Sequence, residues 1–405
     1  MADIELYVHI PFCVKKCDYC DFLSGVYNTT IQHEYSLALA EEIKFLGRQF
    51  PDDTVATVYI GGGTPSWLRE EDMAIIMNAV NTAFHISNDS EITIEVNPGT
   101  VTVDKIRFYR TLDINRVSIG LQSANDDELK ILGRIHTYER FLYSYDAIRK
   151  GNMHDVNVDV MTGLPYQTTE KLGRTLAAVT ALRPEHISAY SLIIEKGTPF
   201  YERYRFDEVK QHAGMQTEAL PGDEESYNLY RYAIDYLEKR RYSRYEISNY
   251  CRDDFYRCIH NVGYWKRVPY IGVGIGAASL YAEHRMKNMT DIHEYIKLAN
   301  TLNKPGFTHT PLNETNPIHS PLWIEDNSLS REDAMSEFMY LGLRMLEGIT
   351  RNEFRDAFNI DIETIYGPVL QSLKNQNLLT IDGGHIKLTD LGIDVSNQVL
   401  ACFLL

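Results

Sequence analysis

The chain has 405 residues, of which 40 are basic and 56 acidic, so its formal net charge at neutral pH is −16. Hydrophobic residues make up 44% and charged residues 24%, which excludes a disordered or low-complexity chain, and the negative charge disfavours nucleic-acid binding. Because no apolar run approaches the roughly 20 residues of a membrane span and the first residues do not form a signal peptide, we expect a multidomain, cytoplasmic protein without an integral membrane segment.

The first half of the chain alternates short β-branched runs with longer amphipathic stretches. We predict strands over residues 6–10, 55–60, 91–96, 116–121, 156–161 and 186–190. Helices are predicted between them, over residues 34–50, 70–84, 104–112, 138–150 and 170–182. Six strand–helix units are typical of a parallel sheet, and a closed barrel needs eight, so we predict an α/β fold with a partial, open (β/α)6 barrel. Such folds place their functional sites at the C-terminal ends of the strands.

The composition changes after residue 190. Residues 190–281 hold 14 of the 27 tyrosines together with the glycine-rich run 271–276. These tyrosines either fill a second packing layer as large half-polar side chains or line the wall of a planar, largely apolar ligand. We interpret residues 1–200 as the barrel, 201–300 as an α+β extension and the proline- and asparagine-rich residues 301–330 as a linker.

Residues 331–405 predict a winged-helix-like unit. Helices are expected over residues 331–346, 351–358 and 362–374, and we expect Gly367 and Pro368 to interrupt the third. Two strands, 378–381 and 386–388, flank an Asp-Gly-Gly turn, and a last helix follows. Because the charges are mixed and no basic recognition helix stands out, a structural cap is favoured over DNA binding.

Three of the six cysteines, Cys13, Cys17 and Cys20, lie within eight residues, in the loop expected after the first strand. Three thiolates at this spacing can each hold one corner of a cubane and leave its fourth iron without a protein ligand. A zinc site, the weaker alternative, needs a fourth Cys or His close by, and the compartment and odd number disfavour a disulfide. The spacing therefore favours an iron–sulfur cluster whose open iron takes a small chelating ligand.

The Cys-x3-Cys-x2-Cys pattern, followed by Phe22, resembles the radical S-adenosylmethionine (SAM) superfamily. In that family SAM chelates the free iron, and the reduced cluster cleaves SAM to a 5′-deoxyadenosyl radical. The string from Tyr7 to Cys13, Tyr-Val-His-Ile-Pro-Phe-Cys, more narrowly resembles the oxygen-independent coproporphyrinogen III dehydrogenases and the related HemW heme chaperones. The resemblance is strong over residues 5–290 and looser after them.

Further motifs match the SAM site of that superfamily. Glycines 61–63 follow the second strand, where missing side chains let the backbone approach a ligand, although such a run alone is more often a turn. Glu95 and Asp159 lie in otherwise apolar strands, which is costly unless each meets a ligand or, alternatively, caps a neighbouring loop. The planar fork of Arg134 suits the SAM carboxylate. The resemblance assigns these residues to cofactor binding: Tyr7, Gly62, Gly63, Thr64, Glu95, Gln122, Arg134 and Asp159.

The string His-Asn-Val-Gly-Tyr-Trp, residues 260–265, separates the two families. It resembles the motif associated with heme binding in HemW proteins, which makes His260 the candidate axial heme ligand. A lone histidine is more often an ordinary hydrogen-bonded group, and a Cys258 thiolate is a weaker alternative ligand. The dehydrogenases also carry an extra cysteine where this chain has Phe22, and a longer N-terminal extension before the position of Tyr7.

We therefore expect a radical SAM-type heme chaperone that binds a 4Fe–4S cluster, SAM and heme and transfers heme to acceptor proteins. A reductant such as flavodoxin or ferredoxin is expected as a further partner. The alternative is an oxygen-independent coproporphyrinogen III dehydrogenase, which abstracts hydrogen from propionate side chains, so whether the chain is an enzyme stays open. A radical SAM methyltransferase with a related sequence is a third alternative.

Overall fold

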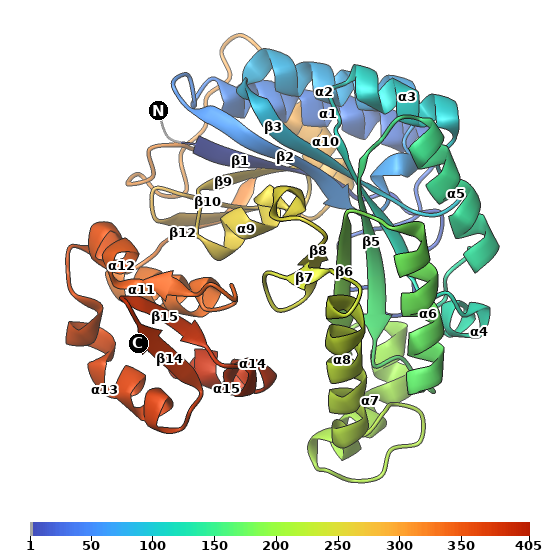
Figure 1. The fold of residues 1–405 in the computed structure, drawn as a ribbon. Helices are drawn as coiled ribbons and strands as arrows, with labels where there is room; N and C mark the ends of the chain where they lie inside the picture. Colours follow the sequence, from blue (N-terminus) through green and yellow to red (C-terminus); the bar gives the residue numbers. More distant parts are fainter. Residues whose placement is uncertain (1–2) are drawn as a thin grey trace.

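The computed structural model describes residues 3–405, and six parallel strands form the centre of its 12-stranded sheet (Figure 1). The strands lie side by side in chain order and are β1 Asp3–Ile10, β2 Thr54–Gly62, β3 His85–Val96, β4 Arg116–Gln122, β5 Asp155–Thr162 and β6 His186–Ser191. Every predicted strand lies within an observed one. All five pairings between these neighbours are parallel, which confirms the α/β fold with a partial six-unit barrel.

Helices cover the outer face of these strands (Figure 1). They are α1 Thr29–Gly47, α2 Glu70–Ala83, α3 Val103–Thr111, α4 Asp126–Ile131, α5 Tyr138–Lys150 and α6 Thr169–Leu182, with a 3-10 turn at Pro65–Trp67. Helix α1 begins five residues before the predicted start because the side chain of Asn28 accepts a hydrogen bond from the backbone N–H of Ile31. Within residues 3–405 no helix is both long and apolar enough to cross a membrane.

The extension lengthens the sheet at both edges. On the β6 side lie α7 Pro199–His212, α8 Asp223–Glu238, β7 Ser243–Arg244, β8 Asn249–Cys251 and a 3-10 turn, Asp254–Tyr256. On the β1 side lie α9 Ile259–Trp265, β9 Tyr270–Val273, β10 Ala278–Tyr281, β11 His284–Asn288, α10 Ile292–Ala299 and β12 Trp323–Ser328. Strand β9 pairs parallel with β1, and the segment interpreted as a linker contributes β12.

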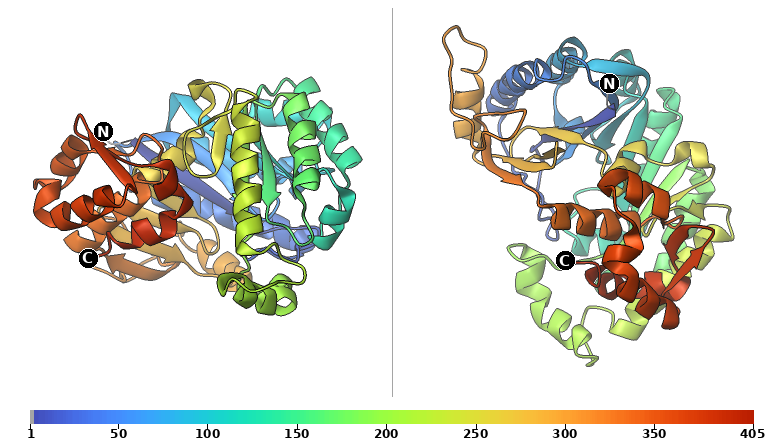
Figure 2. Two further views of the ribbon diagram at one scale, coloured as in Figure 1. Left: turned by 60° about the horizontal axis from the view of Figure 1, so that its bottom comes forward. Right: turned by 90° about the vertical axis from the view of Figure 1, so that its left-hand side faces the viewer.

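The C-terminal unit has a core of its own, built around buried Met339, Phe354 and Tyr366. Its elements are α11 Arg331–Gly342, β13 Ile349–Thr350, α12 Arg351–Phe358, α13 Ile362–Asn375, β14 Leu379–Asp382, β15 His385–Leu388, α14 Asp390–Asp394 and α15 Ser396–Ala401. The wing has three strands, one more than predicted, and two short helices replace the single last one. Figure 2 shows the unit beside the sheet, where the hydroxyl of Tyr227 on α8 donates to Asp394 at 3.0 Å.

The interruption predicted at Gly367 and Pro368 is wrong, because α13 runs through both residues. A proline clashes with the Cβ of the residue before it when that residue is helical, and Gly367 has no Cβ. The face of α13 that carries Ile362, Tyr366 and Leu370 is buried in the core of the unit. This burial offsets the hydrogen bond that Pro368 cannot donate.

Candidate functional site

The three cysteines and most predicted cofactor residues line one cavity of about 480 Å³ at the C-terminal ends of the parallel strands. This volume lies in the usual range of small-molecule sites. The predicted residues that line it are Cys13, Cys17, Cys20, Gly62, Gly63, Thr64, Glu95, Gln122, Arg134 and Asp159. Tyr7 and His260 are not among its lining residues. The parallel register thus gathers side chains from five strands and the loops after them.

The cysteine sulfurs receive hydrogen bonds from neighbouring elements. The hydroxyl of Thr64 donates to Cys13 Sγ at 3.7 Å, and Nη1 of Arg134 donates to Cys17 Sγ at 3.6 Å. Burial raises the pKa of the Cys20 thiol to about 11, so cluster ligation there releases a proton at neutral pH. Within residues 3–405 no three His, Cys, Asp or Glu side chains converge on one metal ion. Three thiols spread along a cavity wall, with donors to the sulfurs, fit a cubane whose irons each take one thiolate.

Hydrogen bonds to β4 and to the residue that follows β3 hold the Arg134 guanidinium at the cavity. Its Nη2 donates to Asn97 Oδ1 at 2.7 Å and to the Gly120 carbonyl at 2.6 Å. Its Nε–H is buried without a hydrogen-bond partner in the part of the chain that the structure describes. The guanidinium is therefore oriented in advance and keeps hydrogen-bonding capacity for an anionic group.

Glu95 holds the glycine loop that follows β2. Its Oε2 accepts a hydrogen bond from the Gly62 N–H and its Oε1 accepts one from the Tyr59 hydroxyl, both at 3.0 Å. Gly62 has a φ of +114°, and a Cβ there would lie 2.6 Å from the ring of His9, so only glycine fits. Burial, followed by the charge of Asp159, raises the pKa of Glu95 to about 7. Glu95 is therefore compatible with both interpretations of its sequence position, as a ligand contact and as a cap of a loop, because it lines the cavity and also binds a neighbouring loop.

Asp159 and Gln122 lie on the next strands of the same cavity. Asp159 accepts hydrogen bonds from Asn157 Nδ2 at 2.7 Å and from the Ser118 hydroxyl at 3.3 Å, while burial raises the pKa of its carboxyl. Gln122 accepts a hydrogen bond from the Tyr190 hydroxyl at 2.9 Å and has a φ of +72°. A left-handed backbone at a residue other than glycine is uncommon and clusters at binding sites.

Tyr7 lies behind the cavity and supports the cysteine loop. Its hydroxyl donates to Nδ1 of His9 at 3.0 Å, and Nε2 of His9 donates to the Leu23 carbonyl at 2.8 Å. Burial raises the pKa of Tyr7 and lowers that of His9, so both groups are neutral at neutral pH. The chain of hydrogen bonds connects β1 to the end of the loop that carries the cysteines.

His260 is buried within α9, and both of its ring nitrogens have partners. Nδ1 shares a hydrogen bond with the Thr57 hydroxyl at 2.7 Å, and Nε2 shares one with the Tyr264 hydroxyl at 3.0 Å. Burial, followed by the charge of Arg116, lowers the pKa of His260 to about 3. The ring is therefore neutral, as a metal ligand must be, but heme ligation requires one of these hydrogen bonds to open.

Helix α9 is anchored by the Glu91 carboxylate of β3. The Glu91 carboxylate accepts hydrogen bonds from the N–H groups of Ile259 at 3.0 Å and His260 at 3.2 Å, and the Cys258 thiol donates to it at 3.5 Å. Burial raises the pKa of Cys258, which keeps it a thiol. A Cβ on Gly263 would lie 1.9 Å from Glu5 Oε1, so the glycine of the motif leaves room for the carboxyl group of Glu5.

The sequence interpretation missed several polar residues of the cavity. Asn97 donates to the Thr64 hydroxyl at 2.7 Å and accepts from Arg134, so it links two predicted residues. Asn97 directly follows β3, and this position at the C-terminal end of a parallel strand could have identified it from the sequence. Other missed lining residues are Tyr19, Tyr59, Ser118, Asn157 and Tyr190. Tyr59 and Ser118 alternate along their strands with buried apolar residues, and this period of two marks the opposite face.

Comparisons with known proteins identify the class of fold. The family model of the radical SAM superfamily matches residues 7–179, and that of the HemN C-terminal domain matches residues 329–395. The chain superimposes on a structure titled coproporphyrinogen III oxidase (HemN) from Escherichia coli, with a TM-score of 0.82, 21% identity and coverage of 100% of this chain and 90% of the other. The fold is that of a radical SAM protein.

Curated relatives narrow the class further. The heme chaperone HemW of Lactococcus lactis is 32% identical over 98% of this chain and 97% of its own length. The heme chaperone HemW of Escherichia coli is 31% identical over 100% of this chain and 99% of its own. The chain belongs to the HemW family.

Proposed function

We propose that the chain is a radical SAM-type heme chaperone that binds a 4Fe–4S cluster, SAM and heme and transfers the heme to acceptor proteins. The observation that carries this proposal is the cavity in which three thiols lie beside Arg134, Glu95 and Asp159. The full-length similarity to proteins named heme chaperones supports it.

Within the cavity, Cys13, Cys17 and Cys20 would ligate the cluster, and the cluster with SAM supplies radical chemistry when both are bound. Thr64 and Arg134 donate hydrogen bonds to two of the sulfurs and so stabilise them as thiolates. Arg134 would bind the carboxylate of SAM with its Nε–H, which has no hydrogen-bond partner within the described residues. Gly62 and Gly63 leave room for its amino group, while Glu95 fixes the loop they form. Gln122 and Asp159 complete the polar wall.

For heme, His260 is the proposed axial ligand. Ligation through Nε2 requires the Tyr264 hydroxyl to release that nitrogen. Two large apolar side chains are exposed near His260: Phe255, in the 3-10 turn before α9, is 81% exposed, and Ile259, the first residue of α9, is 49% exposed. They offer contact area for a planar apolar ligand that approaches α9 from solvent.

Heme titration of the cluster-loaded protein tests the proposal. We expect a sharp Soret band for the wild type, a shifted or lost band for His260→Ala, and an unchanged band for His212→Ala, which replaces an exposed histidine of α7. An unchanged band in His260→Ala contradicts the ligand assignment alone.

A second assay separates the chaperone from the dehydrogenase. The same preparation is incubated with coproporphyrinogen III, SAM and reductant, and the porphyrin products are analysed. We expect no decarboxylation. Turnover of coproporphyrinogen III would overturn the chaperone as the main role, whatever the Soret band does.

The remaining expectations complete the proposal. We propose a cytoplasmic location, a reductant such as flavodoxin or ferredoxin, and a division into residues 1–200, 201–300, 301–330 and 331–405. The separate core of the C-terminal unit supports its boundary.

A further inference from the structure

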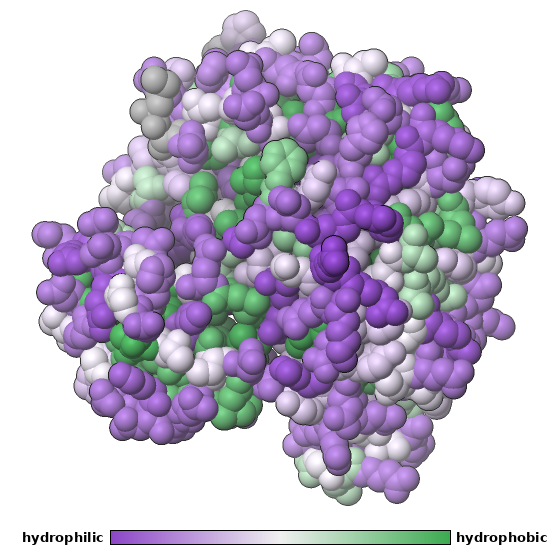
Figure 3. Space-filling view, in the orientation of Figure 1, coloured by the Kyte–Doolittle hydropathy of each residue, from purple (hydrophilic) through white to green (hydrophobic). Residues whose placement is uncertain are grey.

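A second cavity, of about 490 Å³, lies at the other end of the parallel strands, beside the C-terminal ends of α6 and α8. Four arginines and two tyrosines line it: Arg183, Arg240, Arg241, Arg252, Tyr236 and Tyr242. We call it the arginine cavity. In Figure 3 the deepest purple, which marks the most hydrophilic residues, gathers at the upper end of α8, where these segments meet.

The four guanidinium groups of the arginine cavity are not neutralised by the protein. Within residues 3–405 none of them forms an ion pair, although the chain carries 56 carboxylates against 40 basic groups. The carboxylate nearest in sequence to Arg183, that of Glu185, is paired with Arg149 at 2.8 Å. Four like charges around one cavity repel one another, so the cavity favours an anion.

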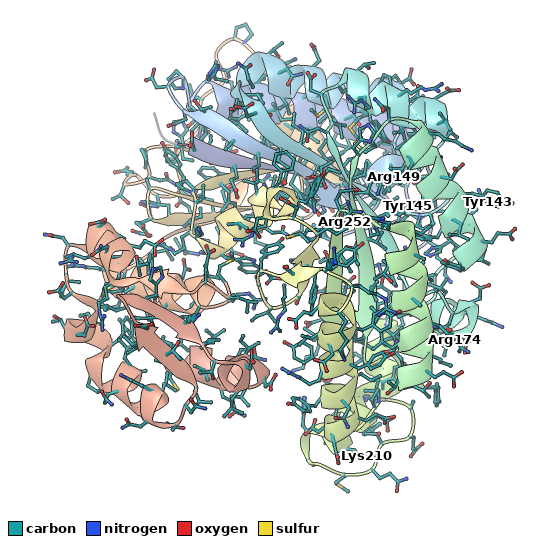
Figure 4. The ribbon with its side chains drawn as sticks, in the orientation of Figure 1. Tyr143, Tyr145, Arg149, Arg174, Lys210 and Arg252 are labelled. Atoms are coloured by element: carbon teal, nitrogen blue, oxygen red, sulfur yellow. The ribbon has the colours of Figure 1, made fainter. Side chains whose placement is uncertain are left out.

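The local structure holds these side chains in place. The guanidinium of Arg240 stacks on the ring of Tyr236, 3.5 Å from its centre. Nη1 of Arg252 donates to the Arg183 carbonyl at 3.0 Å, and the buried Tyr242 hydroxyl donates to the Pro184 carbonyl at 2.8 Å. Figure 4 places Arg252 at this end of the sheet, with Tyr145 and Arg149 of α5 close by.

The backbone of the arginine cavity is also unusual. Arg183, directly after α6, has a φ of +52°, and Arg241, shortly after α8, has a φ of +65°. Both are left-handed conformations that glycine or asparagine adopts more easily, yet both positions carry arginine. Such conformations concentrate at ligand-binding segments.

Attraction to the negative ends of α6 and α8 explains only part of this arrangement. A helix C-terminus favours a positive side chain, and Arg252 does bind a carbonyl at the end of α6. Three further guanidinium groups make no hydrogen bond to those carbonyls within the described residues. Arginine rather than lysine at all four positions indicates bidentate recognition of planar or tetrahedral oxyanions.

We propose that the arginine cavity binds a small molecule that carries two or more phosphate or carboxylate groups. The guanidinium groups of Arg183, Arg240, Arg241 and Arg252 bind the oxyanions, and Tyr236 and Tyr242 form the walls. A concave cavity of this volume fits a small molecule, and the site is separate from the cysteine cavity and independent of the function proposed for it.

Calorimetric titration of the full chain tests the proposal with two probes, inorganic pyrophosphate and citrate, at constant ionic strength set with sodium chloride. The double variant Arg240→Gln/Arg252→Gln is compared with Arg107→Gln/Arg205→Gln, which removes two charges from exposed ion pairs elsewhere. We expect saturable binding of at least one probe to the wild type and to the control, and at least about 10-fold weaker binding to the cavity variant. Tighter binding of pyrophosphate identifies a phosphorylated ligand, and tighter binding of citrate a polycarboxylate.

Thermal unfolding without ligand gives a second readout. The cavity variant loses the stack of Arg240 on Tyr236 and the hydrogen bond of Arg252, but also the repulsion between like charges, so we expect it to remain folded at the temperature of the titration. The proposal is overturned if neither probe binds the wild type at millimolar concentration, or if both double variants bind equally well.

Discussion

The ring of Tyr59 stacks on the ring of His260, with centroids 5.0 Å apart and planes 21° apart. The hydroxyl of the same tyrosine donates to Glu95, which holds the glycine loop of the cysteine cavity. One side chain therefore separates the proposed heme ligand from the cavity and touches both. A substitution at His260 or at Glu95 can therefore affect the other residue through the two contacts that Tyr59 makes.

Tyr59→Phe tests this connection. The variant keeps the stack on His260 and loses the hydrogen bond to Glu95, so Glu95 fixes the Gly62 loop less firmly. We expect SAM affinity, measured by calorimetry on cluster-loaded protein, to fall about 3- to 10-fold while the Soret band stays unchanged. Tyr143→Phe, at an exposed position of α5, is the matched control. Unchanged SAM affinity in Tyr59→Phe would show that the loop does not depend on this hydroxyl.

Replacing any of Cys13, Cys17 or Cys20 with alanine should abolish the brown 4Fe–4S absorption after anaerobic reconstitution, because a cubane held by three thiolates does not survive the loss of one. Cys402→Ala removes an exposed thiol and should retain full iron content. Absorbance and iron analysis measure the outcome. A Cys20→Ala protein that still assembles about four irons and binds SAM normally would refute the ligand set.

Arg134→Ala and Glu95→Ala should both weaken SAM binding about 10-fold or more, because each removes a charged contact. They should differ at the cluster. Nη1 of Arg134 lies 3.6 Å from Cys17 Sγ, so Arg134→Ala should also shift the cluster absorption, whereas Glu95→Ala should not. Calorimetry and absorption spectra of the reconstituted proteins measure the two effects. Wild-type SAM affinity in both variants would remove these residues from the site.

Glu5→Gln should change how stability depends on pH. Burial, followed by the charge of Glu91, raises the pKa of Glu5 to about 9, so the folded chain holds a proton that the unfolded chain has lost above about pH 4.5. This contribution to stability is complete below the unfolded pKa and is lost as pH rises toward 9. We expect the variant to gain on the wild type by roughly 1 kcal/mol per pH unit between pH 6 and 9.

Thermal unfolding at several pH values measures that gain. Glu34→Gln, which changes an exposed carboxylate of α1, should track the wild type throughout. If the curves of Glu5→Gln and the wild type run parallel across this range, the Glu5 carboxyl is already ionised at neutral pH.

The six parallel strands could be predicted because short runs in which β-branched and other apolar residues recur at every second position, as in β1, β4 and β5, are plain in the sequence. The strands of the extension could not be predicted from the sequence. Its strands β7 to β9 have two to four residues each, too few for a period of two, and they form because existing edges offer hydrogen-bond partners. The interruption predicted at Pro368 was wrong because the burial of α13 in the core of its unit outweighs the preference of proline against a helix interior.

Part of the candidate site could likewise be predicted from the sequence, and part could not. Cys13 and Glu95 reach one cavity because one follows a strand and the other lies in one, and parallel strands end at one edge; Arg134 reaches it from the loop after α4. The surroundings of His260 depend on Thr57, Glu5 and Glu91, three residues of different strands that approach α9 only in the folded chain. Spacing within the motif contains no information about these partners.

The parallel pairing of β1 with β9 has a consequence for synthesis of the chain. Glu5 pairs with Tyr270, so a strand among the first residues made waits for a strand more than 260 residues further along the chain before its second edge is filled. During elongation that edge presents unpaired backbone N–H and C=O groups, which other strands can bind. Contacts this distant in sequence also slow folding. The barrel therefore emerges from the ribosome with the second edge of β1 unpaired. We expect substitutions in β9 to lower the yield of soluble protein before they lower the affinity for a cofactor.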